Sequence, residues 1–105
     1  MGAKRLGNHR TAGAGAATDL YAGVANGSTF NIKAVNDTGA QVTIKISIST
    51  ATGTHQVAGL LVPDDFTLEA DQTLDIGGNA IDAGEFVVVQ AGAAGVVFTA
   101  MGVEA

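Results

Sequence analysis

The sequence predicts an all-β protein, an antiparallel β-sandwich of about seven or eight short strands. Residues 41–50 alternate apolar and polar side chains with a period of two, which is the pattern of a half-buried strand. Clusters of Gly, Asn and Asp interrupt the chain at intervals of about 8–12 residues, as they do in sandwiches and barrels. No window has the period of an amphipathic helix. We therefore expect a sandwich of jelly-roll or immunoglobulin-like type, preceded by an extended N-terminal arm.

The expected strands alternate with short turns along the chain. Asn26-Gly27 and the segment 36–39 are typical of tight turns, because Gly adopts a positive φ without strain. Residues 86–89 and 96–98 are apolar at consecutive positions, which indicates central strands covered on both faces. The strands are expected at 18–21, 29–36, 41–50, 55–62 (the weakest), 66–68, 74–76, 86–89 and 96–98.

The strand at 41–50 makes the clearest prediction about the core. Aliphatic β-branched side chains occupy every second position, and polar side chains occupy the positions between them. In a strand, successive side chains point to opposite faces of the sheet, so the aliphatic set shares one face. The core face of this strand is therefore expected to consist of Val42, Ile44, Ile46 and Ile48.

Charge and composition change at about residue 17. Residues 1–17 have three basic side chains and no carboxylate, whereas residues 18–105 have two Lys against all ten Asp and Glu. The first segment is rich in Gly and Ala, so it buries too little apolar surface to order itself. We expect an arm at 1–17 that is ordered by neighbouring chains, and a β-sandwich domain at 18–105. The expected partner-binding residues of the arm are Lys4, Arg5, Leu6 and Arg10.

Composition argues against several classes of protein. The chain has no Cys, which excludes disulfides and thiolate metal sites. The basic N-terminus lacks the apolar stretch of a secretory signal, and no apolar run has the length of a membrane helix, so no membrane partner is expected. A net charge of −5 argues against nucleic-acid binding. Only 14% of the residues are charged, which indicates either covered surface or a β surface rich in Ser and Thr.

The sequence offers no reaction centre. His9 and His55 are the only imidazoles, and neither has a second His or Glu at metal-ligand spacing, so we expect exposed or interface histidines. No Ser stands in a G-x-S-x-G turn. Acidic residues cluster at 64–71 and 75–85, but they lack D-x-D-x-D-G spacing, and turns are naturally rich in Asp. We therefore expect no catalytic, cofactor-binding or metal-binding residue, and no enzyme.

Three segments follow a recurring pattern. TDLYAG at 18–23 has a T-x-LY opening, VNDTGAQVTIKISIST at 35–50 has an N-x-x-x-x-x-V-x-I-x-I-S strand, and residues 73–105 contain Gly84-Glu85 and close on Gly102-Val103-Glu104. In these features the chain resembles the small β-sandwich virion structural proteins of tailed bacteriophages, of the capsid decoration or cement type. It departs from them at AGVANG, where a V-P-A-G turn is expected.

The resemblance implies a protein of the virion, located on the capsid surface. The expected function is that of a decoration protein, which binds the outside of the phage head and stabilises the junctions between coat subunits. The expected partners are the major capsid protein or other virion proteins, and further copies of the chain in a dimer or trimer. The alternatives are a neck, tail or baseplate protein of the same fold, or a module that binds host-surface sugars or receptors. Such a module would need a groove with aromatic side chains.

Overall fold

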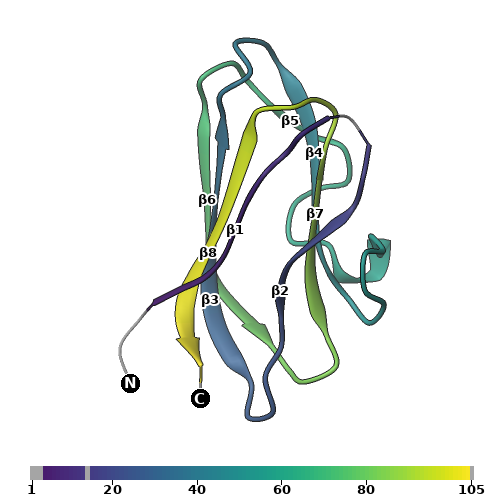
Figure 1. Ribbon diagram of the computed structural model, residues 1–105, viewed down its shortest axis with the longest axis vertical. Coiled ribbons are helices and arrows are strands. Elements are labelled where there is room, and N and C mark those ends of the chain that lie inside the picture. Colours follow the sequence, from purple (N-terminus) through teal and green to yellow (C-terminus); the bar gives the residue numbers. More distant parts are fainter. Residues whose placement is uncertain (1–3, 14, 105) are drawn as a thin grey trace.

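Two antiparallel sheets pack face to face, as the computed structural model shows for residues 4–13 and 15–104 (Figure 1). Sheet A contains, in spatial order, β1 (Lys4–Arg10), β8 (Val96–Glu104), β3 (Ser28–Asn36) and β6 (Thr73–Ile81). Sheet B contains β2 (Thr18–Ala22), β7 (Phe86–Ala91), β4 (Val42–Ser49) and β5 (Phe66–Leu68). The predicted all-β sandwich is confirmed.

Helical structure is restricted, in the part of the chain that the structure describes, to one 3₁₀ turn. This turn, η1 (Val57–Gly59), lies between β4 and β5. No helix within the described ranges is long and apolar enough to cross a membrane.

The strand order is that of a jelly roll. Strand β1 pairs with β8, β2 with β7, β3 with β6 and β4 with β5, so the chain runs as one long antiparallel hairpin. Rolling up this hairpin brings β8 beside β3 and β7 beside β4, which produces two four-stranded sheets. β7 and β8 thereby become interior strands of their sheets, as predicted. Val88 on the outer face of β7 is fully buried, whereas Val97 on the outer face of β8 stays partly exposed, so coverage on both faces holds for β7 but not for β8. The topology selects the jelly roll over the immunoglobulin-like arrangement.

The core lies between the two sheets and consists mainly of aliphatic side chains. From sheet B, Val42, Ile44 and Ile46 are buried in it, and Ile48 packs against it while staying partly exposed. Phe98 of β8 is the largest fully buried side chain. Full burial of each such residue contributes about 1.5–3 kcal/mol of transfer free energy, which makes this layer the main source of stability.

Residues 50–56, which we call the strap, cover the outer face of sheet B. One row across this sheet runs from Asp19 on β2 through Val88 on β7 to Ser47 on β4. The strap binds the Asp19 carboxylate at one end of the row and the Ser47 hydroxyl at the other. Val88 and Ser47 are fully buried, although both point away from the core. Sheet B is therefore covered on both faces along this row, whereas Thr43 and Thr67, farther from the strap, are exposed.

The strap changes the burial expected for β4. Ser47 and Ser49 occupy positions that alternation predicts to face solvent, but both are fully buried, and Ile48 is only half-buried. The alternation rule assumes that one face of the sheet is open to water, and the strap removes that condition here. The strand predicted at 55–62 is also wrong, because that segment contains η1 and forms one isolated bridge, between Leu60 and Ser47.

Residues 4–10 form the edge strand β1, which corrects the prediction of an arm ordered only by neighbouring chains. β1 pairs along its length with β8, so these residues belong to the sandwich. Thr11 then fixes the end of the strand: it is buried, and both its backbone and its hydroxyl hydrogen-bond the segment between β7 and β8. The arm residues 1–3 and 14 lie outside the described residues.

Candidate functional site

An open groove lies on the outer face of sheet A, where β3, β6 and β8 meet. Its volume is about 630 Å³. Gly78 contributes no side chain to it, and a Cβ there would meet no atom within 4 Å, so the surface is hollow beside the taller residues around it. The backbone at Gly78 has a positive φ of 76°, and its N–H donates to the side-chain oxygen of Asn31 on β3. This face contrasts with the outer face of sheet B, which the strap covers.

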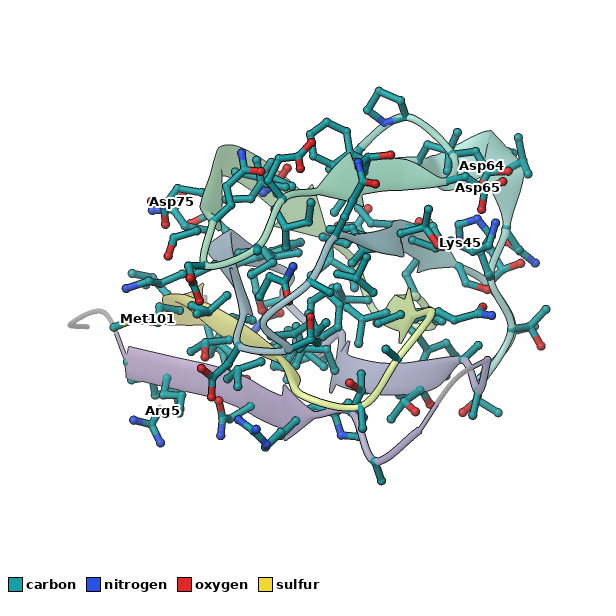
Figure 2. The ribbon with its side chains drawn as sticks, turned by 90° about the horizontal axis from the view of Figure 1, so that it is seen from above. Arg5, Lys45, Asp64, Asp65, Asp75 and Met101 are labelled. Carbon is teal, nitrogen blue, oxygen red and sulfur yellow. The ribbon has the colours of Figure 1, made fainter. Side chains whose placement is uncertain are left out.

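The groove and its rim combine apolar and basic side chains. Met101 is 52% exposed and lies opposite Arg5 of β1 and Asn31 of β3 in the register of the sheet (Figure 2). Lys33 stands on the same face, opposite Asp75 of β6. Among the described residues, no carboxylate forms a salt bridge with Arg5 or Lys33. This face therefore has a small excess of positive charge on an acidic protein.

The four residues predicted to bind a partner through the arm fall in different places. Lys4 pairs with Glu104, with 2.6 Å between Nζ and Oε1, and Arg10 pairs at 3.4 Å with a carboxylate of the β3–β4 loop. Leu6 packs against the core. Only Arg5 joins the rim of the groove. Exposed ion pairs of this kind add little stability and exchange readily, so the binding of a partner by Lys4 and Arg10 stays a prediction.

Glu104 joins the two sheets at the end of the sandwich where β1 begins. Tyr21 of β2 donates its hydroxyl proton to Glu104 at 2.6 Å, so Ser28 of β3 donates to the Tyr21 oxygen at 2.7 Å. The hydrogen bond from Lys4 and, to a smaller extent, the hydrogen bond from Tyr21 hold the pKa of Glu104 below its ordinary value. Burial raises the pKa of the Tyr21 hydroxyl, and its hydrogen bond to Glu104 raises the pKa further. These contacts connect β1, β2, β3 and β8, so their role is structural.

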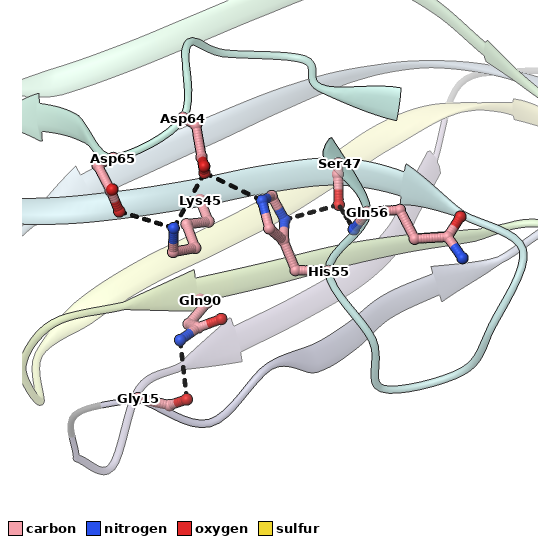
Figure 3. Close-up of polar contacts among 8 residues, drawn as sticks. All are labelled: Gly15, Lys45, Ser47, His55, Gln56, Asp64, Asp65 and Gln90. Atoms are coloured by element: carbon pink, nitrogen blue, oxygen red, sulfur yellow. Dashed lines mark hydrogen bonds and ion pairs between the residues drawn. The ribbon is translucent and has the colours of Figure 1, made fainter. Parts of the chain in front are cut away.

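A second polar cluster lies on sheet B, where the strap meets the turn before β5 (Figure 3). Nζ of Lys45 lies 2.9 Å from Asp64 Oδ1 and 2.7 Å from Asp65 Oδ1. His55 Nε2 lies 3.1 Å from the same Asp64 oxygen, and its Nδ1 lies 2.9 Å from Ser47 Oγ. Because a carboxylate only accepts, Nε2–H donates to Asp64, and in the neutral tautomer that this requires Nδ1 accepts from the Ser47 hydroxyl.

Ser47, His55 and Asp64 have the residue types of a hydrolytic triad but not the access that one needs. Ser47 is fully buried, and its Oγ also accepts the Gln56 N–H at 3.3 Å, so a substrate cannot reach it. The hydrogen bond from Lys45, more than that from His55, holds the pKa of Asp64 below its ordinary value. Asp64 is therefore ionised at neutral pH, and the cluster fastens the strap to sheet B.

His55 lies in a more enclosed position than the sequence indicated. His55 is not the exposed histidine that the sequence allowed, since its side chain is only 13% exposed where the strap folds back onto β4. A role of either histidine at an interface stays a prediction. The spacing between His55 and Ser47 carries no motif, so sequence reasoning missed their contact. Within residues 4–13 and 15–104, no group of three His, Cys, Asp or Glu side chains is arranged to hold a metal ion.

An exposed apolar turn follows the strap. Val57, the first residue of η1, is 63% exposed, and Ala58 beside it is also exposed. Figure 1 shows this turn projecting from the side of sheet B that faces away from sheet A. Val57 and Met101 are the exposed large hydrophobic residues of the described part, and sequence reasoning singled out neither. No pattern around an isolated Val or Met distinguishes a surface position from a core position.

No protein-family model, curated protein or solved structure matches the chain.

Proposed function

We propose that the chain is a non-enzymatic structural protein of a phage particle, of the capsid decoration type, bound to the outside of the head at junctions between coat subunits. The identity rests on the sequence resemblance at 18–23, 35–50 and 73–105. The jelly roll also occurs in viral capsid and lectin domains, which supports the proposal by analogy of fold.

The observation that carries the proposal is the open groove on sheet A. It combines an exposed Met101 with the cations Arg5 and Lys33, and no described segment covers it. Methionine and arginine are enriched at protein interfaces, and a local charge excess selects partners and guides association. The molecule therefore offers a contact surface, whereas its buried Ser47–His55–Asp64 cluster offers no reactive group to a substrate.

Attachment in this proposal uses a folded surface and not a flexible arm. The first strand is part of sheet A, so its residues are ordered by β8 within the same chain. A preorganised surface avoids the entropy of ordering a segment on binding. Modest contacts repeated over a symmetric shell then give a high overall avidity.

A module that binds host-surface sugars has less support. Sugar grooves are lined with exposed aromatic side chains, and the aromatic residue of this groove, Phe30, is only 3% exposed. The groove instead presents amide, hydroxyl, basic and thioether groups from a single sheet.

The test is the copy number of the chain in purified virions, measured against the major coat protein by quantitative mass spectrometry. A decoration protein is expected at a copy number comparable with that of the coat protein. A copy number that is a small fraction of it would contradict decoration and support a neck, tail or baseplate protein. Absence of the chain from the particle would contradict any virion role.

A further inference from the structure

We propose that copies of this protein associate head to tail, with the exposed η1 turn of one copy seated in the sheet A groove of the next. This inference goes beyond the proposed function and does not depend on it, because it concerns the isolated chain. It follows from where the exposed apolar residues lie, from the shapes around them and from the charges beside them.

The first observation is the placement of the two exposed large hydrophobic residues. Met101 lies in the groove on sheet A, and Val57 lies on η1 over sheet B. Figure 2 shows Met101 on the opposite side of the molecule from Lys45 and Asp64, which belong to the cluster beside the strap. A contact that covers both residues at once therefore joins two different surfaces, and that is a heterologous contact.

The second observation is shape. Met101 sits at a hollow of about 630 Å³, in the range of sites that enclose a sizeable group. η1 is a projection: Val57 and Ala58 are exposed at the tip of a short turn. A projecting turn and an open groove on opposite sides of one chain are complementary between copies, since neither can reach the other within a copy.

The third observation is charge. Arg5 and Lys33 stand at the groove without a salt bridge to any described carboxylate, and Asp75 offsets one of them. The turn is acidic on its side: His55, two residues before Val57, contacts Asp64 at 3.1 Å, and the adjacent Asp65 is well exposed.

Lys45 contacts both carboxylates but brings one positive charge against their two negative charges. The η1 side therefore has a net negative charge, opposite to that of the groove. Opposite local charges favour this orientation over two grooves or two turns facing each other. The net charge of −5 on every copy opposes association, and salt at physiological strength screens that repulsion beyond about 8 Å. Local complementarity then decides the geometry.

A head-to-tail contact leaves a free groove at one end and a free turn at the other. It therefore propagates until it closes into a ring or continues as a filament.

The experiment uses the full chain and two variants, Val57→Ser and Met101→Ser, in sedimentation velocity runs from micromolar to millimolar concentration. Both residues are exposed, so both variants are expected to fold, which circular dichroism checks. Ala70→Ser introduces the same hydroxyl at an exposed turn outside both surfaces and serves as the matched control. Should either Ser variant unfold, Val57→Thr and Met101→Gln replace them.

The expected result is association of the wild type and of Ala70→Ser, and weakened association in each of the other variants. An equimolar mixture of Val57→Ser and Met101→Ser is expected to form a species of two chains and nothing larger. The intact groove of the first variant binds the intact turn of the second, whereas the two remaining surfaces have lost their apolar side chains.

Three outcomes would overturn the proposal. One is a wild-type protein that stays monomeric over the whole range. Another is a mixture that stays monomeric while the wild type associates. The third is loss of association in Met101→Ser with wild-type association in Val57→Ser, which would indicate a symmetric dimer through sheet A. None of these outcomes depends on the copy number in virions, so the two proposals fail separately.

Discussion

The Lys45–Asp64 ion pair shows how single residues secure the strap. The pKa of Lys45 is raised by its hydrogen bonds to Asp65 and then Asp64, and the pKa of Asp64 is lowered chiefly by its hydrogen bond from Lys45. Each shift favours the charged form of its residue. The pair is therefore charged on both sides through the neutral range, and it weakens when either partner loses its charge.

Asp64→Asn is expected to lower the melting temperature at pH 7 by a small amount. Asp64 has a folded pKa below the ordinary value of 3.8, so its carboxylate stabilises the fold above that pH. The contribution is lost as the pH falls through the lower folded pKa, so the difference between the wild type and Asp64→Asn should close in acid. Differential scanning calorimetry from pH 7 to pH 2.5 measures it.

The matched control for this series is Asp82→Asn, whose side chain forms no hydrogen bond or salt bridge with the described residues. It should melt at the wild-type temperature across the same range. A gap between Asp64→Asn and the wild type that persists unchanged at the acid end would mean that the carboxylate charge does not fasten the strap.

At the scale of elements, β1 is a strand that the amino-acid composition of its segment does not predict. Its residues are mostly exposed, and few of them are strong strand formers. It gains its stability from β8, which presents a row of backbone groups for pairing, and from the close approach of Gly7 to β2. A Cβ built on Gly7 would stand 2.0 Å from the Leu20 carbonyl oxygen.

Gly7→Ala is therefore expected to displace β1 and to destabilise the protein by about 1–3 kcal/mol, the usual effect of overpacking. The matched control is Gly13→Ala in the following linker, where a Cβ would meet no atom within 4 Å. It should be neutral, or stabilising by about 0.4–1 kcal/mol because it restricts the unfolded chain. Urea unfolding of both variants measures the difference. Equal free energies of unfolding for the two variants would support the prediction that residues 1–17 are an arm independent of the sandwich.

At the scale of the whole molecule, the jelly roll joins residues that are far apart in the sequence into one cooperative unit. Tyr21 of β2 is bonded to Ser28 of β3 and Glu104 of β8, so its ring senses the docking of sheet B on sheet A. The chain has no Trp and no other Tyr, so tyrosine fluorescence reports this single position.

Unfolding in denaturant is expected to follow one curve whether it is measured by Tyr21 fluorescence or by far-ultraviolet circular dichroism. A single core shared by two sheets leaves no part able to unfold alone, as is usual for single domains of this size. A fluorescence transition that precedes the dichroism transition would show that the sheets separate before they melt, and would contradict a single cooperative unit.

The sequence by itself determined the fold class, because a period of two is a local property of neighbouring residues. Val42, Ile44 and Ile46 share a face whatever their partners are, and the turn residues break the chain at the right places. The sequence also made plain the charge difference between its two parts. It did not indicate the groove, since Met101 of β8, Lys33 of β3 and Gly78 of β6 come from different strands.

The tertiary structure alone decided which surfaces are covered. Ser47 is buried because the strap returns over β4, and residues 4–10 form a strand because β8, at the other end of the chain, lies beside them. Burial on an outer face and pairing at a sheet edge depend on segments that are distant in sequence. The local pattern of apolar residues therefore does not predict either of them. That is why the sequence predicted most of the strands but missed β1, and why it predicted an arm where the structure has an edge strand of sheet A.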